Sequence, residues 1–264
     1  MRRYYYEGLI LPQYDVLIEG DVFHHIFVVC RMQVGNSFEL ISNNGKAFFV
    51  EVVVVEKKRA LVRVKEERLI PKLRMPLIDL YVSFPRISTF ESIVEKSVEM
   101  GVNSIHPFLS EFSFIRTREH FPDNKVNRWH KIILQATQQS GRGDLMLIQE
   151  IKSLDICLQG IHEEGQLNIF SYEGVTPLSL KEYLQSRCLL NQNQTLEKMN
   201  LNRKLSKINI FVGSEGGYSH REVELFKEKG IPPVTIGDQI LRVETACMAL
   251  VSCLKYEFDL YERV

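Results

Sequence analysis

The sequence predicts an α/β protein in which a small β-barrel precedes a domain with a parallel sheet. Up to about residue 70, short runs rich in β-branched and aromatic residues are separated by turn residues, which is typical of a small barrel. After Pro76, apolar strand-like runs alternate with helix-like stripes, which predicts a parallel sheet. With 264 residues, 45% of them hydrophobic, we expect two globular domains, over residues 1–72 and 73–264.

Three runs of residues predict the barrel strands: FELIS, KAFFVEVVVVE and RALVRVK. The Asn44–Gly45 step between the first two is a strong hairpin signal. Tyr4–Tyr6 near the start predicts a further strand with alternate rings buried. The segment Pro71–Pro76, with a proline at each end, predicts the linker to the second domain.

The second domain begins with the apolar strand run LIDLYVSF. Ser88 and Glu91 then have the spacing of a capping box, so we expect a helix from this point to Gly101. SIHPFL predicts the next strand. An apolar stripe over residues 126–136 predicts a second helix, with Trp129 in its buried face.

Further along, LNIFSY, INIFVG and PPVTIG predict three more strands. Ser219 and Glu222 form a second capping box, and the last helix is expected from about Glu244 to Tyr261. The Asn- and Gln-rich stretch Ser186–Lys207 lies between two predicted strands, so we interpret it as a surface insertion.

Charge, hydropathy and cysteine content exclude several classes of protein. Lys plus Arg and Asp plus Glu both number 33, so nucleic acid would have to bind a local patch rather than the overall charge. No apolar run reaches the roughly 18 residues of a membrane span, and the start lacks the apolar stretch of a signal peptide. Five cysteines without a CxxC pair favour a reduced, cytoplasmic setting.

Two glycine turns are the strongest local signals for a binding site. Gly213–Gly217 follows one predicted strand, and Gly237 follows another. Ligands bind at the carboxyl ends of strands in α/β sheets, and glycine lets them approach the backbone. Neither GxGxxG nor GxxxxGK[ST] is present, so a Rossmann or phosphate-loop site is not supported. The residues leave two interpretations open. The two glycine segments could be ordinary tight turns, with Arg242 and Glu244 as a solvated pair at a helix start, or they could lie side by side and form one common pocket.

The adjacent His24 and His25 are the only local hint of a metal site. No Cys or Asp nearby has ligand spacing. We therefore expect no metal.

Five sequence blocks, in order over about residues 2–255, carry a resemblance to a known family. GSEGGYSHREVELFKEKG and IGDQILRVETA resemble the paired signature of the bacterial ribosomal RNA uridine-N3 methyltransferases of the RsmE type, in the SPOUT superfamily. EKSVEMGVNSIHPFLSEFS, RWHKIILQATQQSGR and HHIFVVCRMQVG resemble its other blocks. The chain departs from the usual pattern at Ser214, Gln239 and Val243, where proline, arginine and threonine are usual.

The resemblance implies a SPOUT α/β trefoil-knot domain behind a PUA-like RNA-binding barrel, acting as a homodimer. It implies S-adenosylmethionine as cofactor and N3 of a uridine in small-subunit (16S) ribosomal RNA, free or in the subunit, as the target. The cofactor-binding residues carried over from the family are Tyr172, Glu173, Gly213, Ser214, Glu215, Gly216, Gly217, Ile236, Gly237, Gln239, Ile240 and Leu241. The candidate RNA-binding residues are Arg2, Arg3, Arg31 and Arg142.

The chemistry of uracil points to two catalytic candidates. N3 carries a proton and becomes a good nucleophile only when that proton leaves. The resulting charge spreads onto O2 and O4, where a cation stabilises it. We assign the cation to Arg242 and the role of base or orienting group to Glu244; Glu215 is a candidate to offset the positive sulfur of the donor. The alternative is a non-catalytic RNA-binding or ribosome-assembly factor on a degenerate knot domain, which Gln239 and Val243 keep open.

Overall fold

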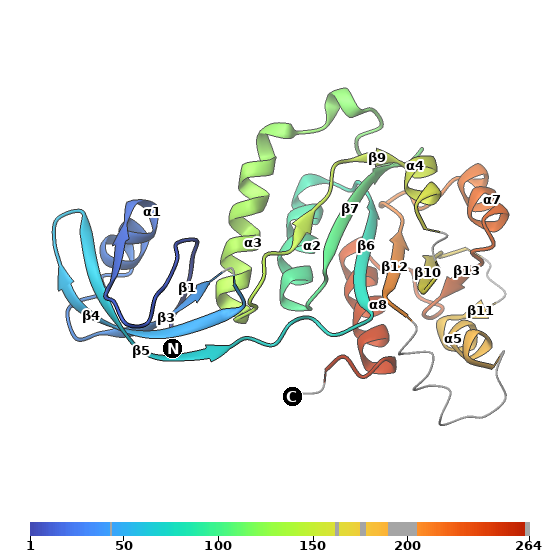
Figure 1. Ribbon diagram of the computed structural model, residues 1–264. Helices are drawn as coiled ribbons and strands as arrows, with labels where there is room; N and C mark the ends of the chain where they lie inside the picture. Colours follow the sequence, from blue (N-terminus) through green and yellow to red (C-terminus); the bar gives the residue numbers. More distant parts are fainter. Residues whose placement is uncertain (43, 162–163, 175–177, 190–204, 262–264) are drawn as a thin grey trace. The chain divides into compact units, whose positions relative to one another are not determined.

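The computed structural model describes residues 1–264 except 43, 162–163, 175–177, 190–204 and 262–264. The chain forms two compact units, each described by itself below (Figure 1). The first contains residues 1–72 and 133–145, and the second contains residues 73–132 and 146–264. The expected domain boundary coincides with residue 72, but residues 133–145 group with the first unit. Most of the predicted insertion, residues 190–204, lies outside the described residues.

The first unit is built on a five-stranded sheet in the order β1-β3-β4-β5-β2. Its strands are β1 (Arg3–Tyr6), β2 (Val16–Glu19), β3 (Ser37–Ser42), β4 (Lys46–Val55) and β5 (Arg59–Leu69). β3 and β4 pair antiparallel on either side of the predicted Asn44–Gly45 turn. The hydroxyl of Tyr6 on β1 donates to the carbonyl of Leu17 on β2 at 3.1 Å. The two edge strands therefore meet, and the sheet curls into the expected barrel.

A short helical segment covers the core of this unit. It consists of α1 (Gly20–Phe23) and the π-helix η1 (His24–Val29), and it buries Ile26 and Phe27 against the sheet. The prediction of alternate burial in Tyr4–Tyr6 was wrong. Tyr4 packs into the barrel core, and Tyr5 is also buried, in a second cluster with Ile41 and Ile70. Residues from 133–145 join that second cluster, so β1 is covered on both faces.

The second unit is an α/β structure on a parallel sheet in the order β11-β13-β10-β12-β6-β7-β8, with β9 also paired to β7. Its strands are β6 (Leu77–Ser83), β7 (Ser104–Leu109), β8 (Leu147–Ile148), β9 (Lys152–Ser153), β10 (Gln166–Ser171), β11 (Leu178–Ser179), β12 (Lys207–Val212) and β13 (Pro233–Thr235). All the pairings between these strands are parallel. The parallel sheet predicted from the alternating pattern is confirmed.

Helices cover both faces of this sheet (Figure 1). They are α2 (Ile87–Glu99), α3 (Val126–Ser140), α4 (Leu154–Gln159), α5 (Leu180–Leu189), α7 (His220–Glu228) and α8 (Val243–Glu257), with 3-10 turns η2 (Arg118–His120) and η3 (Asp123–Lys125) before α3. α2 and α8 pack together, and α8 contacts β12. α4 and α7 contribute to an aromatic cluster with Phe170, Phe211 and Tyr218. Trp129 is fully buried beside Phe90, as the apolar stripe predicts.

One predicted helix cap is confirmed and one is wrong. The Ser219 hydroxyl accepts from the backbone of Glu222, and the Glu222 carboxylate accepts from the Ser219 backbone, which completes the second capping box. α2 instead begins at Ile87, one residue before Ser88, and no side chain of its own caps it. The Glu91 carboxylate forms an ion pair with Arg128 at 2.6 Å, so this ion pair takes the place of a capping contact.

A buried carboxylate joins the central strands at their amino ends. Asp79 on β6 is 1% exposed and accepts hydrogen bonds from Asn103 and Ser104, both at 2.7 Å. The Lys207 ammonium on β12 lies 2.9 Å from its other oxygen, and the His106 ring lies 3.6 Å away. Burial alone would raise the pKa of Asp79, but these partners outweigh burial and hold the pKa well below its usual value.

Replacing Asp79 by asparagine is expected to lower the free energy of unfolding by about 2 kcal/mol, because charge-assisted bonds are lost in a buried position. A carboxyl whose pKa is lowered in the folded state stabilises above its unfolded pKa and loses this effect as pH falls toward the folded pKa. The difference between wild type and Asp79→Asn in urea melts should therefore be constant above about pH 5 and shrink below about pH 4. The exposed Asp155→Asn serves as control. A difference unchanged at low pH would contradict the role of the charge.

Candidate active site

A cavity of about 570 Å³ opens at the carboxyl ends of three parallel strands in the second unit. Three segments that follow β10, β12 and β13 supply most of its wall: residues 171–173, 212–215 and 235–244. The starts of α2 and α8 complete it, through Arg86, Ser88, Thr89 and Ala246. The volume lies within the range of small-molecule sites. The two glycine turns singled out in the sequence therefore open onto one cavity.

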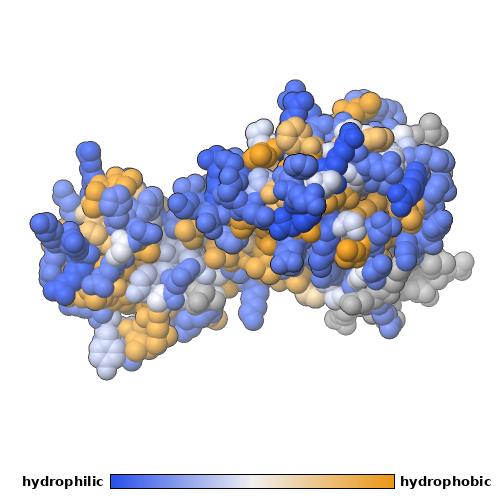
Figure 2. All heavy atoms as spheres, turned by 90° about the horizontal axis from the view of Figure 1, so that it is seen from above, coloured by the Kyte–Doolittle hydropathy of each residue, from blue (hydrophilic) through white to orange (hydrophobic). Residues whose placement is uncertain are grey.

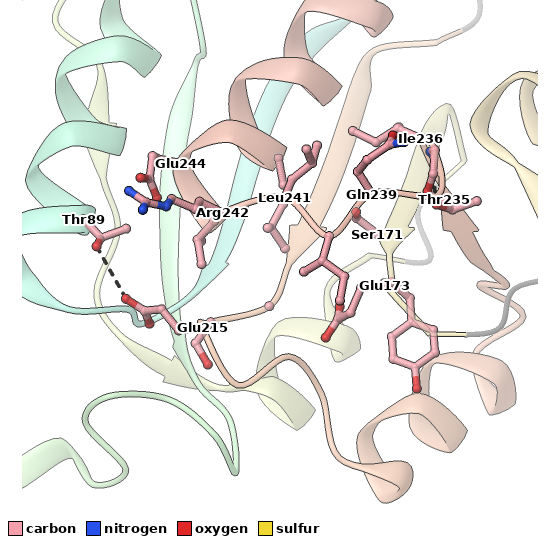
Figure 3. Close-up of a pocket in the computed structure, with 18 of the residues that line it drawn as sticks. Thr89, Ser171, Glu173, Glu215, Thr235, Ile236, Gln239, Leu241, Arg242 and Glu244 are labelled. Atoms are coloured by element: carbon pink, nitrogen blue, oxygen red, sulfur yellow. Dashed lines mark hydrogen bonds between the residues drawn. The ribbon is translucent and has the colours of Figure 1, made fainter.

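The lining residues separate into two ends (Figure 3). The residues drawn toward one end are Thr89, Glu215, Arg242 and Glu244, and those toward the other are Ser171, Glu173, Thr235, Ile236 and Gln239. Leu241 lies between the two groups. One end thus carries the catalytic candidates, and the other is formed by the segments after β10 and β13.

Of the twelve cofactor candidates, ten line this cavity and two do not. Those that line it are Tyr172, Glu173, Gly213, Ser214, Glu215, Ile236, Gly237, Gln239, Ile240 and Leu241. Gly216 and Gly217 belong to the same turn but lie behind its wall. A Cβ at Gly216 would lie 2.7 Å from the Cβ of Phe112, and Gly217 has φ of +68° with the Glu173 carboxylate against it. These two glycines permit the turn to pack, and Gly213, Ser214 and Glu215 form its cavity surface.

The turn rests on a fully buried tyrosine. Tyr218 follows it directly and is stacked against Phe108. Burial raises the pKa of Tyr218 well above its usual value, and the nearby Glu222 and Glu173 carboxylates add to this effect. The ring therefore stays neutral and supports the turn. At the other side, the Ser214 hydroxyl donates to the carbonyl of Phe112 at 2.7 Å, so serine has a structural contact at the position where proline is usual.

Glu215 links the glycine turn to helix α2. One of its carboxylate oxygens accepts from the backbone N–H of Arg86 at 3.2 Å and from the Thr89 hydroxyl at 3.4 Å (Figure 3). α2 lacks a capping side chain of its own, so Glu215 supplies the anion that a helix start favours. This contact fixes the turn against the start of α2.

Arg242 and Glu244 stand at the start of α8. Arg242 is the residue before the helix, with extended backbone and no capping contact from its side chain. Glu244 is in the first helical turn. Both line the cavity. The apolar side chain of Ile240 is 81% exposed and that of Leu241 is 37% exposed, so this loop presents apolar surface to whatever fills the cavity.

The four candidate RNA-binding arginines all lie in the first unit, in different surroundings. Arg2 and Arg31 are exposed. Arg3 forms an ion pair with Glu39 at 3.0 Å, and Arg142 is buried and pairs with Asp144 at 2.7 Å. Arg68 shares Glu39; burial alone would raise the pKa of Glu39, but the two arginines outweigh it and lower the pKa. Arg3 therefore also joins β1 to β3, whereas the ion pair of Arg142 is local.

Arg31 has an unusual backbone. Its φ is +55°, in the left-handed region that residues other than glycine rarely adopt. It follows η1, a π-helix, and helices of this type are frequent at functional sites. His24, His25, Val28 and Val29 on η1 are exposed. Figure 2 shows hydrophobic patches among hydrophilic side chains on the face of the first unit that it presents, the mixed surface on which cations and stacking groups can both meet RNA.

Several cavity residues were not among the predicted site residues: Arg86, Ser88, which was expected only to cap a helix, Thr89, Ser171, Thr235 and Asp238. Ser171, Thr235 and Asp238 directly flank predicted residues, so the strand ends were the signal that could have found them. Arg86–Thr89 lie more than 120 residues earlier in the chain, and only the pairing of β6 beside β12 brings them to the same edge of the sheet.

The described part of the chain contains no group of three or more His, Cys, Asp or Glu side chains placed to hold a metal ion. Over the same residues, no helix combines the length and the apolar character needed to span a bilayer.

Comparison with known proteins identifies relatives over nearly the whole chain. The family described as RNA methyltransferase domain matches residues 72–255, and the RNA methyltransferase PUA domain matches residues 18–65. The chain is 31% identical over 240 residues to the ribosomal RNA small subunit methyltransferase E of Aquifex aeolicus, covering 90% of this chain and 93% of that protein. The protein of the same name from Buchnera aphidicola subsp. Schizaphis graminum is 28% identical over 237 residues, 89% of this chain and 87% of that protein.

A solved structure shares the fold. The ribosomal RNA small subunit methyltransferase E of Neisseria gonorrhoeae, bound to S-adenosyl methionine, superimposes with a TM-score of 0.76 at 24% identity, covering 97% of each chain. Together with the match to the PUA domain, this likeness confirms the expected α/β fold behind a PUA-like barrel.

Proposed function

The chain belongs to the RNA methyltransferase domain family, and on that premise we propose that it methylates N3 of a uridine in small-subunit (16S) ribosomal RNA. The methyl donor is S-adenosylmethionine. The observation that carries the proposal is one cavity shared by the carboxyl ends of β10, β12 and β13, with Arg242 and Glu244 at one end. The names of the relatives agree with methylation of small-subunit ribosomal RNA.

The cavity wall suits this donor. When bound, S-adenosylmethionine supplies an electrophilic methyl group on a positively charged sulfur. Glu173, Glu215 and Asp238 on the wall favour a cationic ligand. Ile240 and Leu241 offer the apolar contact that an adenine ring needs. We assign the donor to the three loops after the strands, with Gly213 allowing close approach to the backbone.

Arg242 and Glu244 then act on the target base. The guanidinium of Arg242 stabilises the negative charge that develops on the uracil oxygens as N3 loses its proton. Glu244 accepts that proton or orients the base. Glu244 is placed for this role because it lies in the first turn of α8, two residues after Arg242, and lines the same cavity. The target base must be unpaired or flipped out to reach them.

The barrel supplies the RNA contacts. Arg2 and Arg31 are exposed cations at the two ends of the segment that includes η1, and the exposed histidines of η1 offer stacking surface. Arg3 contributes by joining β1 to β3 through Glu39. RNA binding by the first unit is the role expected of residues 1–72.

Replacing Arg2 and Arg31 together by alanine should weaken RNA binding. It should also reduce the magnitude of the slope of log K against log salt concentration by between about 0.7 and 1.8, because each phosphate contact that is lost leaves its counterions on the RNA. Donor affinity should stay the same. The matched control is Lys57→Ala with Lys58→Ala, two exposed cations of the same unit. Binding titrations at several salt concentrations measure the slope; an equal slope in variant and wild type would move the RNA site elsewhere.

We also assign three finer features to this protein: the trefoil knot, a homodimer and a cytoplasmic location. In support of the knot, the chain must return from β13, next to the edge of the sheet, to α8 beside β12. A crystal structure tests the chain path, and sedimentation tests the dimer by a mass twice that of the chain. Fractionation of cells tests the location.

The decisive experiment is mass mapping of ribosomal RNA from a strain lacking this gene. Loss of one methyl group from one uridine of the 16S RNA, restored by the purified protein and donor, is the expected result. An unchanged methylation map would contradict the proposal. Calorimetry with S-adenosylmethionine distinguishes the non-catalytic assembly factor, which would give no heat of binding.

A further inference from the structure

The start of α2 contributes a second arginine to the catalytic end of the cavity. Arg86 precedes the helix and lines the cavity. Its backbone N–H is held by the carboxylate of Glu215 at 3.2 Å, a contact that leaves its guanidinium unused. The backbone of Arg86 is therefore fixed, while its charged group remains available to a ligand.

The guanidinium of Arg86 has no ion pair or hydrogen bond with any residue that the structure describes, and it is exposed. Nearby arginines of the same unit differ: Arg128 forms two bonds with Glu91, and Arg118 forms two with Asp123. Arg242 is likewise without a partner among the described residues. The cavity thus carries two cations on two helices that pack together, α2 and α8.

The acidic wall makes these cations necessary for an anionic ligand. Glu173, Glu215, Asp238 and Glu244 all line the cavity, and their charges oppose the entry of a phosphate. A nucleotide has two negative groups that need a cation: the base, which becomes negative during the reaction, and the phosphodiester, which is always negative. One arginine cannot meet both from a single position.

We propose that Arg86 binds the phosphodiester next to the target uridine, so that the nucleotide is held by its backbone while Arg242 acts on its base. The inference rests on the proposed function and deepens it by naming a substrate-positioning residue. Arg86 fixes the register of the nucleotide, and the base then reaches the donor in the right orientation.

The first test uses Arg86→Ala, which keeps the backbone N–H that Glu215 holds. With an RNA fragment in which the methylated uridine has been mapped, kcat/KM should fall at least tenfold, the scale for one lost charged contact. The donor Kd should stay within about twofold by calorimetry, and the salt slope of RNA binding should fall by about 0.7. Arg86→Lys should restore most of the activity, because a phosphate accepts a point charge. Lys229→Ala, an exposed cation outside the cavity, should change nothing.

The second test replaces the phosphate instead of the arginine. A neutral methylphosphonate next to the target uridine should weaken binding to the wild type as much as Arg86→Ala does, and should cost the variant nothing more. The assignment would be overturned if the losses of RNA affinity caused by the methylphosphonate and by Arg86→Ala added up. It would also be overturned if Arg86→Ala lost donor affinity. A wild-type protein that binds the RNA without methylating it would overturn the proposed function, while the difference in RNA affinity between wild type and Arg86→Ala would still decide the role of Arg86.

Discussion

Replacing Arg242 by alanine is expected to lower the single-turnover rate of RNA methylation about a hundredfold or more, the effect of losing one group that stabilises charge in a transition state. Donor affinity should remain nearly unchanged, because the proposed donor contacts in this segment are the exposed Ile240 and Leu241 and not the guanidinium of Arg242. Arg242 makes no capping contact with α8 through its side chain, so alanine leaves the helix start intact.

Two further measurements separate this role from a structural one. Arg242→Lys should rescue the rate only in part, since an ammonium cannot reproduce a planar, two-pronged contact with the uracil oxygens. Raising the pH should increase the rate of Arg242→Ala, because hydroxide then helps to remove the N3 proton. A variant that loses rate and donor affinity together would place Arg242 in the cofactor site, and catalysis would then depend on Glu244.

The extent to which lysine restores activity distinguishes the two arginines of the cavity. At Arg86, lysine should restore most of the activity, because the proposed ligand is a phosphate that a point charge satisfies. At Arg242, geometry matters as well as charge. Both residues precede a helix and both guanidinium groups lack partners among the described residues, so the difference reports on the ligand and not on the fold.

The architecture was largely predictable because the sequence patterns are local. The Asn44–Gly45 turn and the Ser219 capping box each depend on residues within four positions, and both form as expected. The failed cap at Ser88 shows the limit of such patterns. Glu91 has the right spacing for a capping contact, but it forms an ion pair with Arg128 at 2.6 Å instead. Arg128 lies far along the chain, so a local sequence pattern cannot reveal this contact.

The cavity was predictable only where its residues follow strands. The turns after β12 and β13 were found from their glycines, and the two lie at the same edge of the sheet because the strands are parallel. Arg86 carries no local signal, since a single exposed arginine just before a helix is an ordinary surface residue. Its place in the site follows from strand order, which periodicity does not reveal. For the same reason, the alternate burial expected of Tyr4–Tyr6 was wrong: residues from 133–145, far along the chain, pack against the cluster that holds Tyr5.

The glycine turn after β12 gives the second large expected effect, a loss of donor affinity of more than a hundredfold in Gly213→Val. Gly213 lines the cavity. A Cβ there would lie 3.0 Å from the Tyr218 ring and 3.2 Å from the backbone of Gly217. Alanine therefore needs only small shifts and should weaken binding about tenfold or less, whereas the two added methyl groups of valine have no space inside the turn and must displace the cavity surface.

Calorimetry with S-adenosylmethionine measures this effect, and thermal melts serve as the control for folding. Gly213→Val should lower the melting temperature because its side chain presses on the buried Tyr218 ring, but the protein should stay folded at 25 °C, since Ser214 keeps its bond to Phe112. Gly216→Val is the contrasting variant: it lies behind the wall against Phe112, so it should lower the melting temperature more than Gly213→Val does. Full donor affinity in a folded Gly213→Val protein would show that the donor does not contact this turn, and the site would then have to lie on the β10 and β13 loops alone.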